Sequence, residues 1–116
     1  MCGIVGVYGG QSVDLHESLK TIAHRGPDGH DIQTIPNSAI GHTRLAIIDI
    51  DGGQQPLSDH HQTRWLVCNG EIYNHEQLRL KTPDYAFKTD TDSEVMLALY
   101  DRFGTGIVQQ LDGMFA

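Results

Sequence analysis

The feature that most constrains this chain is a cysteine at position 2, directly behind the initiator methionine. The residues that follow, Gly3 to Tyr8, are β-rich and small and are closed by Gly9-Gly10, so they predict a short strand with Cys2 at its start. If Met1 is removed, Cys2 carries a thiol and a free α-amine, which titrates at about pH 8 and can act as a base. Nucleophile and base would then come from one residue. The alternative is a cysteine that simply packs.

Composition restricts the class of protein. The chain has 116 residues, of which 39% are apolar and 20% charged, as expected for one soluble globular domain over residues 1–116. Its apolar runs are far shorter than the roughly 18 residues that span a bilayer. The N-terminal residues show no positively charged segment followed by an apolar stretch, so we expect no secretory signal. With only two cysteines, we expect a cytoplasmic protein without a membrane partner. A net charge of −7 argues against a nucleic-acid partner.

Apolar periodicity and turn residues predict short helices and strands along the chain. The expected helices are 13–24, 76–80 and 93–103, and the expected strands after the first are 31–35, 39–43, 44–50, 64–68, 85–88 and one that begins within 111–116. Glycine and proline predict loops at 25–29 and 52–56. At the last helix, Thr91 and Glu94 have the spacing of a capping box, and Gly104 supplies a C-terminal stop.

Asn69-Gly70 lies between two β-like runs and has two interpretations. Asn-Gly at such a place is a strong hairpin signal, so a tight turn is the structural one. The functional one is an oxyanion hole, in which an Asn side-chain amide and a Gly backbone N–H point at the oxygen of a tetrahedral intermediate.

Arg44 and Asp92 each have a structural and a functional interpretation. Arg44 leads into an apolar run, so its guanidinium should be buried, either in an internal salt bridge or as a bidentate ligand for a substrate carboxylate. Asp92 precedes a predicted helix. Its negative charge either interacts favourably with the positive end of the helix dipole or binds a substrate ammonium group.

The remaining candidates are predicted to be structural. The seven histidines show no typical metal spacing, and the one tight group, Asp59 with His60-His61, lies in a predicted loop, so we predict no metal site. Cys68 lies in an apolar run and is expected to pack. Arg25 is a candidate clamp rather than a catalyst. Dinucleotide and phosphate-loop motifs are absent from the sequence.

Five ordered motifs together resemble the class II glutamine amidotransferase family, whose members carry an N-terminal nucleophile. The motifs are Met1-Cys2-Gly3-Ile4-Val5-Gly6, His24-Arg25-Gly26-Pro27-Asp28, His42-Thr43-Arg44-Leu45, Asn69-Gly70-Glu71-Ile72-Tyr73-Asn74 and Thr91-Asp92-Ser93-Glu94. Within the family, the segments 44–49 and 55–57 look most similar to the asparagine synthetase branch.

The resemblance implies glutamine as the substrate and Cys2, Asn69 and Gly70 as the catalytic residues. Cys2 would attack the side-chain amide, its α-amine would relay protons through water, and a γ-glutamyl thioester would form as ammonia leaves. Asn69 and Gly70 would stabilise the oxyanion and contact the substrate. The other substrate-binding residues that the resemblance implies are Arg44 for the α-carboxylate, Glu71 and Asp92 for the α-ammonium, and Ile47 and Ile48 along the pocket wall.

The family's fold is α+β, the N-terminal-nucleophile αββα four-layer sandwich with antiparallel sheets. By this resemblance, residues 1–116 are expected to be the N-terminal part of a glutamine amidotransferase domain, truncated at its C-terminus. Asparagine synthetases add a C-terminal domain that activates aspartate with ATP. We therefore expect no cofactor in this chain, with ATP and Mg²⁺ only in that missing synthetase domain, and we expect glutamine and a synthetase domain or partner chain as partners.

Two other hypotheses belong to different classes of protein. The apolar segment 111–116 is also compatible with a non-catalytic glutamine-binding or assembly module that another chain covers. The high histidine content leaves a metal-binding protein as a third hypothesis.

Overall fold

The computed structural model describes residues 1–9 and 14–116, so Gly10 and Val13, which figure in the predictions above, lie outside the described residues. The chain contains both helices and strands, with five strands in succession between residues 29 and 72, and the strands pair in antiparallel fashion, which confirms the predicted α+β class with antiparallel sheets. Among the described helices, none is long and apolar enough to cross a membrane.

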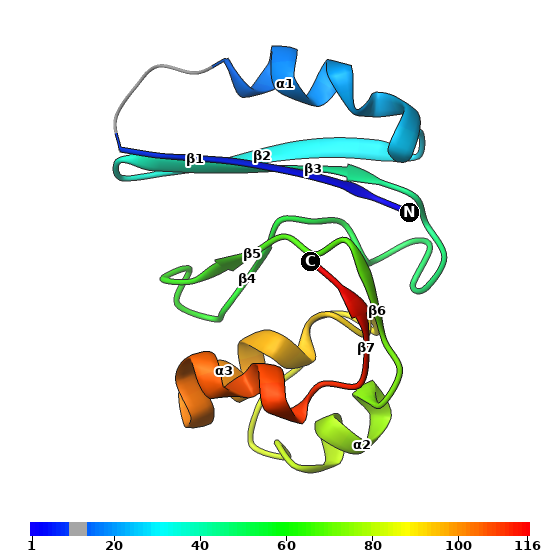
Figure 1. The fold of residues 1–116 in the computed structure, drawn as a ribbon. Helices are drawn as coiled ribbons and strands as arrows, with labels where there is room; N and C mark the ends of the chain where they lie inside the picture. Colours follow the sequence, from blue (N-terminus) through cyan, green and yellow to red (C-terminus); the bar gives the residue numbers. More distant parts are fainter. Residues whose placement is uncertain (10–13) are drawn as a thin grey trace.

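Three strands form the larger sheet, in the order β1-β3-β2 (Figure 1). β1 (Gly3–Tyr8) and β2 (Gly29–Ile35) each pair in antiparallel register with the central β3 (Ser38–Arg44). The three strands predicted in this region are therefore confirmed, two of them with slightly longer bounds. Because the start of β1 lies beside the end of β3, Cys2 and Arg44 come to the same end of the sheet.

Helix α1 (Leu15–Thr21) covers one face of this sheet (Figure 1). The carboxylate of Asp14 caps it by accepting hydrogen bonds from the backbone N–H groups of its first turn. Leu15 and Leu19 are its buried side chains. The helix is shorter than predicted, because a 3-10 helix (Ala23–Arg25) turns the chain toward β2.

The other face of the sheet is turned toward two small strand pairs (Figure 1). β4 (Leu57–Ser58) pairs with β5 (Trp65–Leu66), and β6 (Gly70–Ile72) pairs with β7 (Gly113–Phe115). The strand predicted at 64–68 is thus reduced to two residues, and the strand expected near the C-terminus is confirmed.

Two helices complete the second half of the chain. α2 (His75–Leu80) and α3 (Val95–Phe103) pack around a hydrophobic core, and α3 ends at Gly104 as predicted, with a φ of 52°. A second 3-10 helix (Gly104–Gln110) follows. The buried members of the core are Cys68, Ile72, Leu78, Val95, Met96, Leu99 and Ile107.

The strands predicted at 44–50 and 85–88 are wrong. Beyond Arg44 the chain leaves the sheet, because Asp49 adopts a left-handed conformation (φ 50°) and the guanidinium of Arg44 gathers the carbonyls of residues 48–50 around it. At 85–88 the backbone does not join a ladder, and the N–H of Lys88 instead donates to the carboxylate of Glu94.

The predicted capping box is also wrong. The Glu94 carboxylate accepts hydrogen bonds from the backbone N–H groups of Lys88 and Thr89 and from the Thr89 hydroxyl, and therefore organises the preceding loop. The Thr91 hydroxyl pairs with that of Thr89. Helix α3 accordingly starts at Val95 without a side-chain cap.

Candidate active site

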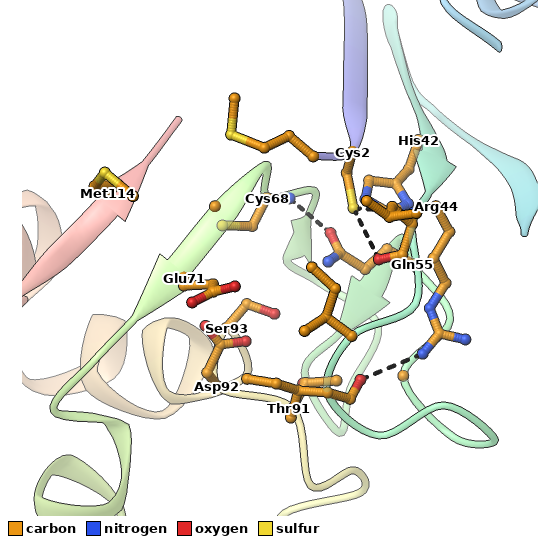
Figure 2. Close-up of a pocket in the computed structure, with 16 residues that line it drawn as sticks. Cys2, His42, Arg44, Gln55, Cys68, Glu71, Thr91, Asp92, Ser93 and Met114 are labelled. Carbon is orange, nitrogen blue, oxygen red and sulfur yellow. Dashed lines mark hydrogen bonds between the residues drawn. The ribbon is translucent and has the colours of Figure 1, made fainter. Parts of the chain in front are cut away.

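A cavity of about 150 Å³ lies where the end of the larger sheet meets β6 and the segment before α3. In Figure 2, Cys2, His42 and Arg44 stand on one side of it, and Cys68, Glu71 and Asp92 stand opposite. Seven of the eight predicted site residues line the cavity: Cys2, Arg44, Ile47, Ile48, Gly70, Glu71 and Asp92. The eighth, Asn69, is their neighbour in the chain but is not among the lining residues.

Cys2 is half-buried directly before β1, and both its thiol and its backbone carbonyl form hydrogen bonds. Its Sγ accepts a hydrogen bond from the Leu45 backbone N–H at 3.3 Å and lies 3.7 Å from the Leu45 carbonyl oxygen. The Arg25 Nε donates to the Cys2 carbonyl at 3.0 Å. Arg25 therefore holds the backbone of Cys2, and the thiol is positioned at the cavity wall.

Arg44 is buried, and backbone carbonyls hold its guanidinium. Nη1 donates to the Ile50 carbonyl at 2.9 Å, and Nη2 donates to the Asp49 carbonyl at 2.5 Å, with the Ile48 carbonyl at 3.5 Å. Within the described residues no carboxylate forms an ion pair with Arg44, so the structure does not support the internal salt bridge. A buried guanidinium whose charge is not neutralised is suited to a ligand's carboxylate.

Asp92 and Glu71 carry negative charge on the opposite wall. The Asp92 carboxylate accepts a hydrogen bond from the Ile72 backbone N–H at 2.6 Å, which fixes it to β6. It caps no N–H of helix α3, which begins at Val95. With Arg44 on one side and two carboxylates on the other, the cavity is complementary to a zwitterionic amino acid.

Asn69-Gly70 is not the turn of a hairpin, because the preceding strand pairs with β4 and the following strand pairs with β7. Gly70 has a φ of 149°, and a Cβ there would lie 1.9 Å from the Met114 carbonyl oxygen, so the close approach of β7 requires glycine. The Asn69 backbone exchanges hydrogen bonds with Ala116, and its buried Oδ1 has no partner among the described residues. The oxyanion role of this pair stays a prediction.

His42 and Gln55 line the cavity without having been assigned a role from the sequence. Both lie in segments that carry the family resemblance. They could not be predicted as cavity residues, because the sequence does not show which face of a strand or loop points inward. The Gln55 Oε1 accepts a hydrogen bond from the Cys68 backbone N–H at 2.6 Å, next to Asn69-Gly70. Gln55 therefore braces the segment that carries the predicted oxyanion donors.

The imidazole of His42 is fully buried, and neither ring nitrogen has a hydrogen-bond partner within the described residues. Burial lowers the pKa of His42 from 6.5 to about 4; the nearby backbone of Cys68 opposes this, and the positive charge of Arg44 adds to it. His42 is therefore neutral near pH 7. It cannot supply the positive charge of the cavity.

The buried His42 should make the fold sensitive to acid. Because the folded-state pKa lies below the unfolded-state value, the unfolded chain binds more protons between about pH 6.5 and 4, and stability is lost as the pH falls through that window. Urea unfolding at pH 7 and 4.5 should show a loss about 2 to 3 kcal/mol larger for the wild type than for His42→Leu. His30→Leu, at an exposed position on β2, is the control and should behave as wild type. Equal losses for His42→Leu and wild type would contradict this assignment.

The candidate metal group is engaged in other contacts. The Asp59 carboxylate accepts hydrogen bonds from the backbone N–H and hydroxyl of Thr63, and the His60 ring contacts the Ala86 carbonyl oxygen at 2.7 Å. In residues 1–9 and 14–116, no group of three or more His, Cys, Asp or Glu side chains is arranged to hold a metal ion.

Known proteins match this chain over its full length. A family model described as a glutamine amidotransferase domain matches residues 1–116. Glutamine-hydrolyzing asparagine synthetase 1 of Bacillus subtilis (strain 168) is 42% identical over 126 residues, which cover 100% of this chain and 20% of that protein. Glutamine-hydrolyzing asparagine synthetase B of Escherichia coli (strain K12) is 42% identical over 123 residues, covering 100% and 22%.

A plant protein gives the same result. The glutamine-hydrolyzing asparagine synthetase of Zea mays is 41% identical over 122 residues, which cover 100% of this chain and 21% of that protein. The chain thus spans about a fifth of the length of these curated relatives. The family match and the identities agree with the resemblance that the five sequence motifs carry. The chain therefore belongs to the class II glutamine amidotransferase family, in the branch of the asparagine synthetases.

Proposed function

We propose that this chain hydrolyses the side-chain amide of glutamine at Cys2 and supplies the ammonia to an acceptor. The observation that carries the proposal is the composition of one cavity, in which a positioned thiol and a buried guanidinium on one side face two carboxylates on the other. Arg44 would bind the α-carboxylate of glutamine, and Asp92 with Glu71 would bind the α-ammonium group. The amide carbon would then face the Cys2 thiol.

The reaction proceeds in two steps. The Cys2 sulfur attacks the amide carbon, and the tetrahedral intermediate collapses as the C–N bond breaks and the nitrogen leaves as ammonia with a proton relayed from the thiol. The product is a γ-glutamyl thioester. Water then attacks the thioester carbon, the C–S bond breaks, glutamate leaves and the thiol is restored.

The oxyanion of each tetrahedral intermediate needs hydrogen-bond donors. In this proposal the donors are the Asn69 side-chain amide and the Gly70 backbone N–H; the hydrogen bond from the Cys68 N–H to Gln55 and the close approach of β7 at Gly70 support this role by fixing the backbone there. The proton relay is the α-amine of Cys2 acting through water, which requires that Met1 be removed. Hydrolysis itself uses no cofactor in this scheme.

The names of the relatives suggest the acceptor. Because this chain matches about a fifth of glutamine-hydrolyzing asparagine synthetases, we propose an asparagine-synthetase-like domain or partner chain as the recipient of ammonia. ATP and Mg²⁺ would serve only that domain. We also propose that the antiparallel sheets here belong to the four-layer αββα sandwich of the family.

A non-catalytic glutamine-binding module is the second candidate, because the proposed base depends on processing of the chain. While Met1 remains attached, the nitrogen of Cys2 is an amide and cannot act as a base, whereas the charged walls of the cavity are unaffected. Such a chain would bind glutamine through Arg44 and Asp92 without hydrolysing it.

Measuring glutamate release and intact mass together tests both candidates. We expect a protein whose mass shows loss of Met1 to form glutamate and ammonia from glutamine in equal amounts. Calorimetric binding of glutamine without glutamate formation by that processed protein would contradict the enzyme and support the binding module.

A further inference from the structure

The loop that follows β3 wraps around Arg44 and is held in place by Asp49. The carbonyls of Ile48, Asp49 and Ile50 surround the guanidinium, as described above. The Asp49 carboxylate accepts a hydrogen bond from the Gly52 backbone N–H at 3.0 Å through Oδ1, and the Gly53 N–H donates to the Asp49 carbonyl at 2.9 Å. Asp49 therefore closes the ring of backbone that orients Arg44.

The same carboxylate reaches the other wall of the cavity. Its Oδ2 accepts a hydrogen bond from the Asp90 backbone N–H at 2.9 Å, across 41 positions of sequence. Asp90 lies two residues before Asp92. Asp49 thus connects the loop that orients the guanidinium directly to the segment that carries the opposite charge.

Close packing at Gly53 supports this connection independently. A Cβ at Gly53 would lie 2.5 Å from the Thr91 Cγ2, 2.9 Å from the Arg44 Nη2 and 3.0 Å from the Asp49 carbonyl oxygen. The two segments therefore meet in van der Waals contact at the place where Asp49 bridges them. Small displacements of either segment would change the separation of the two charged groups.

We infer that Asp49 is a positioning residue that sets the distance between Arg44 and Asp92 and thereby makes the cavity selective for an α-amino acid carrying both charges. This inference rests on the proposed function, because it takes Arg44 and Asp92 as the sites for α-carboxylate and α-ammonium. Asp49 itself does not line the cavity, so it acts through these two residues.

Asp49→Asn is the appropriate variant. Asparagine has the same shape and tolerates the left-handed conformation. If its amide oxygen accepts from the Gly52 N–H, its NH₂ group faces the Asp90 N–H, so two donors oppose each other and the hydrogen bond to Asp90 is lost. We expect the dissociation constant of L-glutamine, measured by calorimetry in a Cys2→Ala background, to rise about 10- to 100-fold. In the active protein, KM should rise by a similar factor with kcat nearly unchanged, since Asp49 contacts neither the thiol nor Gly70.

Two singly charged analogues separate positioning from general structural damage. Glutaramate lacks the α-ammonium group and 4-aminobutanamide lacks the α-carboxylate, so neither needs the fixed distance between the walls. Both analogues should bind more weakly than glutamine, and the dissociation constant of each should be the same for Asp49→Asn and the wild type. Asp51→Asn, at an exposed position of the same loop, is the matched control and should leave all three constants unchanged.

The outcomes distinguish this inference from the proposed function. If the wild type hydrolyses glutamine and Asp49→Asn binds it equally well, the inference is overturned while the function stands. If the wild type binds glutamine without hydrolysing it, the function is overturned and the dissociation constants still decide the role of Asp49. Equal weakening of all three ligands, or a wild type that binds no glutamine, overturns the inference. Should Asp49→Asn fail to fold, Asp49→Glu replaces it, because the extra methylene displaces the two segments while keeping the acceptors.

Discussion

Replacing Cys2 by alanine is expected to lower glutamate formation from glutamine at least about a thousandfold, to the level of a blank without protein. In the proposed mechanism the thiol forms the only covalent bond to the substrate, and removal of a nucleophile commonly costs an enzyme several orders of magnitude in kcat. Binding should survive, since Arg44 and Asp92 are untouched. The measurement is a coupled glutamate assay, with calorimetry to verify that Cys2→Ala still binds glutamine.

Cys68→Ala is the matched control, because it removes the other thiol that lines the cavity. Burial raises the pKa of the Cys68 thiol to about 12, with a further contribution from the negative charge of Asp92, so Cys68 stays protonated near pH 7 and is a poor nucleophile. We expect this variant to keep glutaminase activity within about threefold, with a loss of stability of about 1 to 2 kcal/mol from the small core cavity. Loss of activity on replacing Cys68, with retention after replacing Cys2, would reverse the assignment of the nucleophile.

Local sequence was informative where a segment's structure depends on its own residues. The strand after Cys2 and the glycine that ends α3 could both be predicted, because strand propensity and the need for a positive φ are local properties. The grouping of Cys2 with Arg44 could be anticipated from the family resemblance. Its physical basis is the antiparallel register that brings the start of β1 to the end of β3.

Segments whose structure depends on side-chain contacts or strand pairings that a propensity pattern does not encode could not be predicted. Residues 45–50 are mostly apolar and include three isoleucines, yet they form a loop, because Asp49 is left-handed and the carbonyls of residues 48–50 accept hydrogen bonds from the buried guanidinium of Arg44. Glu94 has the spacing of a capping residue but binds the loop at 88–89. Asn69-Gly70 has the sequence of a hairpin turn, but its flanking strands pair with segments elsewhere in the chain. In the first two cases side-chain hydrogen bonds to backbone groups override the local pattern, and in the third the pairing of the flanking strands does.

Arg44→Lys is expected to raise the KM for glutamine about 100-fold while leaving kcat within a few-fold of the wild type. A lysine keeps the charge, but its three donors cannot satisfy the carbonyls of residues 48–50 and a substrate carboxylate together. A charge-assisted hydrogen bond contributes about 1.5 to 3 kcal/mol, so loss of the bidentate contact accounts for an effect of this size.

The specificity of this effect can be tested with the same ligands. Affinity for 4-aminobutanamide, which has no carboxylate, should be the same in Arg44→Lys and in the wild type, whereas affinity for glutaramate should fall. Arg102→Lys, at an exposed arginine of α3, is the control and should leave the KM unchanged. A fall in kcat at constant KM would instead place Arg44 in the chemical step. Equal weakening of both analogues would mean that the substitution has collapsed the loop at 48–50, because only a ligand with a carboxylate can report the loss of a guanidinium contact.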